Sequence, residues 1–330
     1  ALRDELAKLQ ASVSVSTEGA SIDTVRASLG QALSLAADML RNPSFPQAEF
    51  EQIRRQALTS LDSQRTDPSA LASLQLGRHL NPYPRKHWLY QGSIEEREQE
   101  LRALTLDDVR RCHAELVGAS HAEMAIVGDF DPASTAKLVG ELFGDWQSKA
   151  PYARIATKFY DPRPLDRVIE TPDKANAVYR AAMKLELRDD DPDFAALVLG
   201  NYIFGGASAS RLYQRVREKE GISYSLGSGL SASSEDRVGD FLIVAIYAPE
   251  NRARLEAAIG EELRRVLDEG FSATEIENGK RGLLDARKLA RNQDGTLAGR
   301  IAGYLYLGRT FQWDIDLERR IAAATPDQVR

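Results

Sequence analysis

The hydrophobic and polar positions of the chain follow two different periods. Apolar residues recur every three to four positions in "LGQALSLAADML" (29–40), and again throughout residues 249–320, which predicts amphipathic helices. Three shorter runs predict strands: "NAVYRAAMKLEL" (176–187), "ISYSLGSGLSAS" (222–233) and "VGDFLIVAIYA" (238–248). Strands followed by a long run of helices predict an α+β fold, with helices packed on one face of an antiparallel sheet.

An internal repeat lies within this pattern. The segment "NPSFPQAEFEQIRRQAL" (42–58) matches "DEGFSATEIENGKRGLL" (268–284), so that Phe45 aligns with Phe271 and Leu58 aligns with Leu284. An amphipathic helix precedes both segments, and an arginine followed by a polar turn comes after both, in "RTDPSALA" and "RNQDGTLA". The repeat therefore predicts two homologous α+β domains.

The repeat also sets the expected domain boundaries. We expect a first domain over residues 1–146, a linker over residues 147–166, which has three prolines and no periodicity, and a second domain over residues 167–330. The first copy is expected to lack its opening strands. It continues past "LTLDDVR" into a predicted strand that ends at Gly128 and Asp129, whereas the second copy stops at "ATPDQVR". Both domains are thus expected to be incomplete, in a piece of a longer protein.

Composition and charge narrow the classes of partner. The 330 residues carry a formal net charge of −6, and no basic stripe is interleaved with aromatic residues, so nucleic acid is not an expected partner. No apolar run reaches the length of a membrane-spanning helix, so no membrane partner is expected either. Cys112 is the only cysteine, which excludes an internal disulfide, and its position predicts the buried side of a helix.

The segment "GGASASRLYQRVREKEGISYS" (205–225) carries a resemblance to a known family. Together with "LRNPSFPQAEFEQIRRQAL" (40–58) and "VGDFDP" (127–132), it resembles the pitrilysin/insulinase family of zinc metallopeptidases, the inverzincins. The resemblance implies a metallopeptidase-like α/β roll in each domain. It also implies a catalytic domain with an H-x-x-E-H motif and a later domain with an arginine and a tyrosine seven residues apart, which Arg217 and Tyr224 match.

These two residue types suit peptide hydrolysis. A guanidinium group can clamp peptide carbonyls, and a phenol can donate a hydrogen bond to a tetrahedral oxyanion as it forms. The plain alternative is that Arg217 pairs with Glu218 or Glu220 and that the ring of Tyr224 lies in the core. For Gly205 and Gly206, two roles are compatible: a helix stop that uses positive φ, and a backbone hinge that brings the chain close to substrate.

The sequence holds no metal-binding motif of this family. Its four histidines are His79, His87, His113 and His121, and no two of them are four residues apart. The third zinc ligand of the family would fall near Ser60, in a stretch without glutamate. We therefore expect no metal site and no cofactor in this chain, and the resemblance implies zinc in a partner catalytic half.

The resulting prediction is a non-catalytic half, or non-catalytic subunit, of a zinc metalloendopeptidase that is inactive by itself. Its partners would be peptide substrates and a zinc-bearing half, on the same polypeptide or on a separate subunit. One alternative is a catalytically dead structural relative, like the peptidase-like core subunits of respiratory complexes, and another is a free-standing peptide-binding module. By resemblance to long bacterial members of the family the expected location is periplasmic, and otherwise cytoplasmic.

Overall fold

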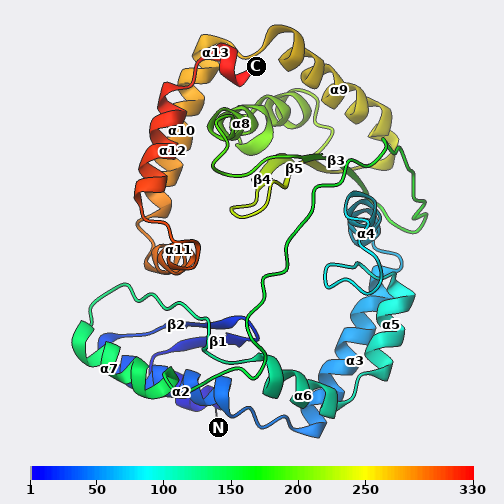
Figure 1. Cartoon of the computed structure of the whole chain (residues 1–330). Helices are drawn as coiled ribbons and strands as arrows, with labels where there is room; N and C mark the ends of the chain where they lie inside the picture. The colour runs from blue at the N-terminus through cyan, green and yellow to red at the C-terminus, as the bar shows by residue number, and fades with distance from the viewer. Residues whose placement is uncertain (1) are drawn as a thin grey trace. The chain divides into compact units, whose positions relative to one another are not determined.

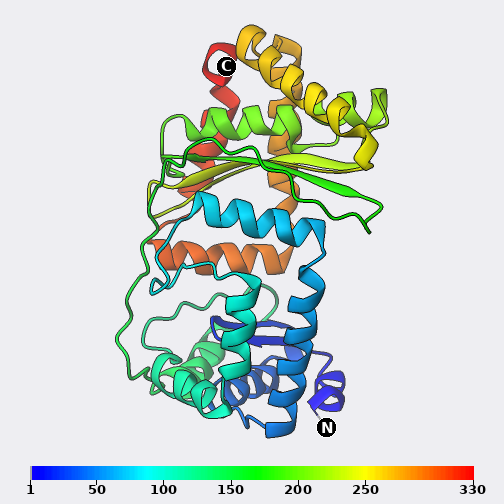
Figure 2. The ribbon, with the colours of Figure 1, turned by 90° about the vertical axis from the view of Figure 1, so that its right-hand side faces the viewer.

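The computed structural model describes residues 2–330 and divides them into two compact units (Figures 1 and 2). The first unit comprises the chain up to residue 57 together with residues 100–154 and 290–309. The second comprises residues 58–99, 155–289 and 310–330. Each unit therefore takes segments from both copies of the sequence repeat.

The first unit is built on a small hairpin. Strands β1 (Ser12–Ser16) and β2 (Gly19–Asp23) pair antiparallel, and helix α2 (Leu29–Arg41) packs against both of them and against helix α7 (Pro132–Phe143). The buried side of α2 follows the helical period, since Ala32, Leu33, Ala36, Ala37 and Leu40 are all buried. The other helices of this unit are α1 (Leu2–Lys8), η1 (Arg26–Ser28), α6 (Leu106–Leu116), α7 (Pro132–Phe143) and α11 (Asp294–Leu307), with the first part of α3 (Gln47–Gln64) and the end of α5 (Ile94–Ala103).

The second unit is built on a three-stranded antiparallel sheet in the order β3-β5-β4. Its strands are β3 (Ala177–Leu185), β4 (Ser225–Ala232) and β5 (Gly239–Tyr247), close to the three runs that the sequence predicts. The helical elements are the end of α3, α4 (Pro68–Leu80), most of α5, α8 (Phe194–Asn201), η2 (Tyr202–Gly206), η3 (Tyr213–Lys219), η4 (Pro249–Asn251), α9 (Arg252–Glu269), α10 (Ala273–Ala290), α12 (Gln312–Ala323) and α13 (Pro326–Val329).

The core of this unit lies on one face of the sheet. Ile243, Ala245 and Tyr247 of β5 are buried against side chains of α8, η2, η3 and α9, including Leu199 and Leu255, which are fully buried. Helix α4 packs against β3, and Figure 2 shows it on the opposite face of the sheet from α8. The predicted α+β class is confirmed, but helices cover both faces of this sheet rather than one, because α4 packs on the second face (Figure 2).

Helix lengths and caps agree with the sequence repeat. Helices α3 and α10 are both 18 residues long, and α6 and α13 both begin with a capping box, at Thr105 and Thr325. Of the aligned residues, Phe271 is buried, whereas Phe45 is half-buried, as are Leu58 and Leu284. The linker and the two domain boundaries stay predictions.

Two local predictions are wrong. Residues 122–127 form no strand, since they pair with none of the described strands. Cys112 is exposed rather than buried. The inner side of α6 runs instead through Leu106 and His113, seven residues apart, and Nε2 of His113 lies 2.8 Å from the carbonyl oxygen of Leu40. Among residues 2–330, no helix is both long and apolar enough to span a bilayer.

Candidate substrate-contact site

Gly205 and Gly206 lie where η2 ends against strand β4. Gly205 is buried, and a Cβ at this position would lie 2.5 Å from Oγ of Ser228 and 2.8 Å from its backbone nitrogen. Only glycine allows so close an approach. Neither Gly205 nor Gly206 has a positive φ, so that part of the expectation is wrong, although the helix does stop here and Ala207 is extended. Their role as a hinge toward substrate stays a prediction.

Arg217 lies near the end of η3, whose inner side is firmly packed. Leu212 and Val216 are fully buried, and the backbone N–H of Ile222 donates to the carbonyl of Val216 at 2.9 Å. Gly221 makes the reversal with a φ of +61°, a value that favours glycine. Burial of Ile222 and Ser223 directly before β4 leaves Tyr224 on the outside, with an exposed fraction of 66%.

The structure brings Arg217 and Tyr224 together. Nη1 of Arg217 donates a 2.9 Å hydrogen bond to the carbonyl oxygen of Tyr224, and the guanidinium lies 5.0 Å from the ring centre of Tyr213. Nη2 of Arg217 has no hydrogen-bond partner in the described part of the chain. The Arg217 side chain is 44% exposed, and its Nε lies 3.7 Å from Glu218. A core position for Tyr224 is therefore excluded, and Glu220 is not the partner of Arg217.

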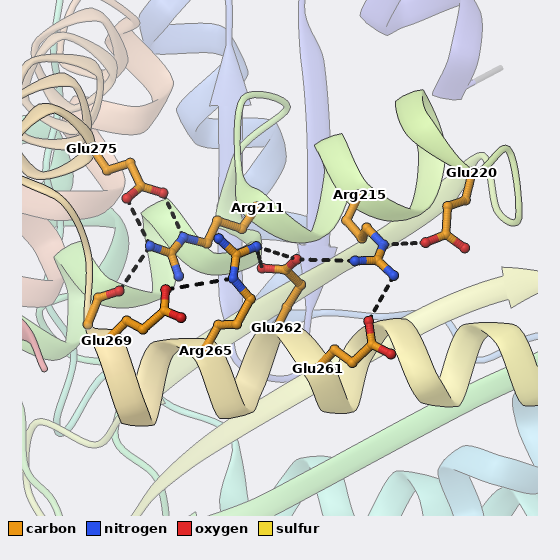
Figure 3. Close-up of polar contacts among 9 residues, drawn as sticks. Arg211, Arg215, Glu220, Glu261, Glu262, Arg265, Glu269 and Glu275 are labelled. Carbon is orange, nitrogen blue, oxygen red and sulfur yellow. Dashed lines mark hydrogen bonds and ion pairs between the residues drawn. The ribbon is translucent and has the colours of Figure 1, made fainter.

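Two arginines that the sequence reading did not single out anchor the segment before Arg217 (Figure 3). Arg211 binds Glu275 of α10 through two hydrogen bonds, of 2.6 and 2.8 Å, and donates to the carbonyl of Gly270 at 2.9 Å. Its guanidinium also lies 4.7 Å from the ring centre of Phe271. Hydrogen bonding from Arg211 is the main cause that lowers the pKa of Glu275 from 4.5 to about 2, and Ser272 adds to it.

The second anchor is Arg215, which joins η3 to α9. Its Nη2 lies 2.8 Å from Glu261, its Nη1 lies 3.8 Å from Glu262, and its Nε donates to Glu220. Glu262 is buried at 3% exposure, and Arg265 compensates its charge from 3.0 Å. Arg215, Glu262 and Arg265 line a charged depression of about 490 Å³ together with Arg211 and Glu275 (Figure 3). The three arginines of "RLYQRVR" thus divide into two anchors and one exposed donor, Arg217.

Three of the histidines contact a backbone carbonyl or stack on a tyrosine ring. Nε2 of His79 lies 2.8 Å from the carbonyl of Arg163, the ring of His87 stacks on Tyr83, and the ring of His121 stacks on Tyr152. Within residues 2–330, no three histidine, cysteine, aspartate or glutamate side chains are placed to hold a metal ion.

Comparison with known proteins identifies the family. The sequence profile of the peptidase M16 inactive domain matches residues 103–283, more than half of the chain. The chain belongs to the peptidase M16 family. This confirms the resemblance to the pitrilysin/insulinase metallopeptidases, and the match is to the inactive domain of the M16 family rather than to a zinc-binding one.

Curated relatives of this M16 protein bear two kinds of name. It is 28% identical over 239 residues to an uncharacterized zinc protease of Streptomyces coelicolor, an alignment that covers 70% of this chain and 50% of the relative. It is 20% identical over 292 residues to the non-peptidase homolog YmxG of Helicobacter pylori, which covers 88% and 66%. The chain spans about half to two-thirds of the length of these relatives.

Several solved structures share the fold of this chain. The peptidase M16 inactive domain from Pseudomonas fluorescens superposes with a TM-score of 0.82 at 22% identity, covering 100% of this chain and 78% of the other. A protease from Helicobacter pylori gives a TM-score of 0.78 at 16% identity, covering 99% and 79%. The periplasmic protease PqqL from Escherichia coli gives 0.71 at 14% identity, covering 99% of this chain and 36% of that protein.

Proposed function

We propose that this M16 protein is the non-catalytic half of a zinc metalloendopeptidase and contacts peptides that a zinc-bearing partner half cleaves. The observation that carries the proposal is the joint exposure of Arg217 and Tyr224, linked by the 2.9 Å hydrogen bond from Nη1 to the Tyr224 carbonyl. The match to the inactive M16 domain supports a role without zinc of its own.

The chemistry assigned to this chain follows from the donors it presents. Tyr224 is exposed, and its phenolic O–H can donate to an oxyanion that develops on a bound peptide. Nη2 of Arg217 can donate to a neighbouring peptide carbonyl, while Nη1 stays on the Tyr224 backbone. Metal-activated water would come from the partner half, because the described part of this chain offers no donor set for zinc.

A second candidate is a non-enzymatic M16 protein that binds peptides or has a structural role. It is favoured by the relative from Helicobacter pylori, which is called a non-peptidase homolog. The two candidates differ in what they require of Tyr224, since only the peptidase half needs its hydroxyl. The periplasmic location of the structural neighbour PqqL makes the periplasm our proposed compartment, with the cytoplasm as the alternative.

Reconstitution tests the proposal. The M16 half with an H-x-x-E-H motif that is encoded nearest to this chain would be expressed with and without it, and hydrolysis of a fluorogenic peptide would be followed. We expect no cleavage by this protein alone and a rate that depends on its presence in the pair. A partner that cleaves equally fast alone would favour the non-enzymatic candidate.

A further inference from the structure

A pocket of about 460 Å³ lies in the second unit, away from Arg217 and Tyr224. It is located at the end of the sheet where Lys184, Asp240 and Ser231 are direct neighbours across β3, β5 and β4. This row lies on the face opposite the core, because the alternate residues of β5, such as Ile243, are the buried ones. The volume is in the range of pockets that hold small molecules.

Lys184 is an unusual residue in this pocket. Its side chain is only 4% exposed, and its single ionic partner in the described chain is Asp240, with 2.9 Å between Nζ and Oδ1. A buried ammonium group is costly unless its charge and its three N–H donors are satisfied. Asp240 compensates the charge, and Nζ of Lys184 has no hydrogen bond to a carbonyl or hydroxyl group of the residues described.

The carboxylate of Asp240 offers the pocket a hydrogen-bond acceptor. Its side chain is 41% exposed, and its Oδ2 accepts no hydrogen bond from any described residue. The pocket therefore presents a cationic donor and an anionic acceptor side by side. In the depression of Figure 3, by contrast, Glu275 and Glu262 are each already bound by an arginine.

We propose that this pocket binds a free α-amino acid. The carboxylate of the ligand would accept hydrogen bonds from Lys184, and its ammonium group would donate to Oδ2 of Asp240, which gives four alternating charges in a ring. An α-amino acid carries both groups on one carbon, which suits the 2.9 Å spacing of the Lys184–Asp240 pair. Tyr83, Leu89 and Val238 also line the pocket and would contact an apolar side chain of the ligand.

Titration with L-leucine tests the site directly. We expect saturable shifts of the backbone amide signals of Ala232 and Val238 in NMR spectra of the purified protein. N-Acetyl-L-leucine lacks the ammonium group and L-leucinamide lacks the carboxylate. Each should bind at least about tenfold more weakly, since each loses a hydrogen bond between charged groups.

Two variants complete the test. Asp240→Asn keeps the shape of the side chain and should weaken L-leucine binding at least about tenfold, and Lys184→Met should do the same. Lys280→Met removes a lysine of α10 that pairs with Glu277 outside the pocket, and it should leave binding unchanged. The proposal is overturned if L-leucine causes no saturable shifts in the unaltered protein, or if N-acetyl-L-leucine binds as tightly as L-leucine.

Discussion

The side chain of Arg217 is bound to the main chain of Tyr224: Nη1 donates to the Tyr224 carbonyl oxygen at 2.9 Å. The contact joins the end of η3 to the start of β4 across the Gly221 turn. An exposed arginine would otherwise sample many rotamers, and this hydrogen bond restricts them. The Arg217 side chain is therefore held beside the backbone of Tyr224, and changes at the two residues have distinct expected effects.

Tyr224→Phe should lower kcat of the assembled peptidase by about tenfold to a thousandfold and leave KM nearly unchanged. The substitution removes one hydroxyl that donates chiefly to the developing oxyanion. Tyr213→Phe is the matched control, because it also removes one phenolic hydroxyl but keeps the ring beneath Arg217. Steady-state kinetics on a fluorogenic peptide would measure both, and equal rates for the Tyr224 variant and the unaltered protein would refute the role.

Arg217→Ala should impair both kcat and KM, because a carbonyl clamp acts in the ground state as well as in the transition state. The free energy of unfolding should fall by no more than about 1–2 kcal/mol, since the lost hydrogen bond to the Tyr224 carbonyl comes from a guanidinium that is 44% exposed and whose ion pair with Glu218 is long at 3.7 Å. Glu218→Gln is the control and should have normal kinetics. A variant with reduced kcat and unaltered KM would instead point to a role confined to the transition state.

Gly205→Ala should destabilise the protein by about 1–3 kcal/mol through overpacking. The new methyl group would collide with the backbone nitrogen of Ser228, 2.8 Å away, which cannot rotate aside as a side chain can. Gly229→Ala in β4 is the control, because no atom lies within 4 Å of its added Cβ. Urea unfolding of the two variants would give the comparison, and similar midpoints would show that η2 and β4 can separate without cost.

Glu275 should make stability depend on pH between about 4.5 and 2. Arg211 lowers the pKa of Glu275 to about 2 in the folded protein, below the usual 4.5, so the stabilisation is complete above pH 4.5 and is lost as the pH falls toward 2. At neutral pH, Glu275→Gln should cost about 1–3 kcal/mol, an amount that solvent screening at this one-third exposed side chain keeps modest.

This prediction for Glu275 is tested by urea unfolding at neutral pH and again near pH 2. The difference in the free energy of unfolding between the unaltered protein and Glu275→Gln should decrease as the pH falls. Glu277→Gln is a control on the same helix, where the side chain is 71% exposed and pairs with Lys280, and it should have little effect. A difference for Glu275→Gln that does not vary with pH would show that its carboxylate is not the stabilising group.

Purified protein should bind no stoichiometric zinc, because the described residues bring no three candidate ligands together. Elemental analysis after dialysis against a weak chelator would measure the metal content. One tightly held zinc per chain would contradict this expectation and would also call for a different assignment of the catalytic half.

Much of the fold could be predicted because its signals are local. The period of Leu33, Ala36 and Leu40 identifies α2, and the Thr105 and Thr325 caps mark where α6 and α13 begin. The pattern failed at residues 122–127, where the alternation suggests a strand but pairing depends on neighbours that the local sequence does not specify.

The candidate site could be predicted only in part. Arg217 and Tyr224 are seven residues apart, so one segment contains both of them and the turn between them. The anchors are different, because Arg211 and Glu275 are 64 residues apart and Arg215 and Glu261 are 46 apart. In a chain with 43 basic and 49 acidic residues, sequence cannot say which charges pair across such distances.

Helix α4 precedes the predicted linker, yet it packs on strand β3, which follows that linker, within one compact unit. A protease cut within residues 147–166 would therefore break the chain between α4 and β3 without breaking the packing between them. We expect the two fragments to stay associated after such a cut, because a cut in the backbone removes none of the side-chain contacts of α4 with the sheet.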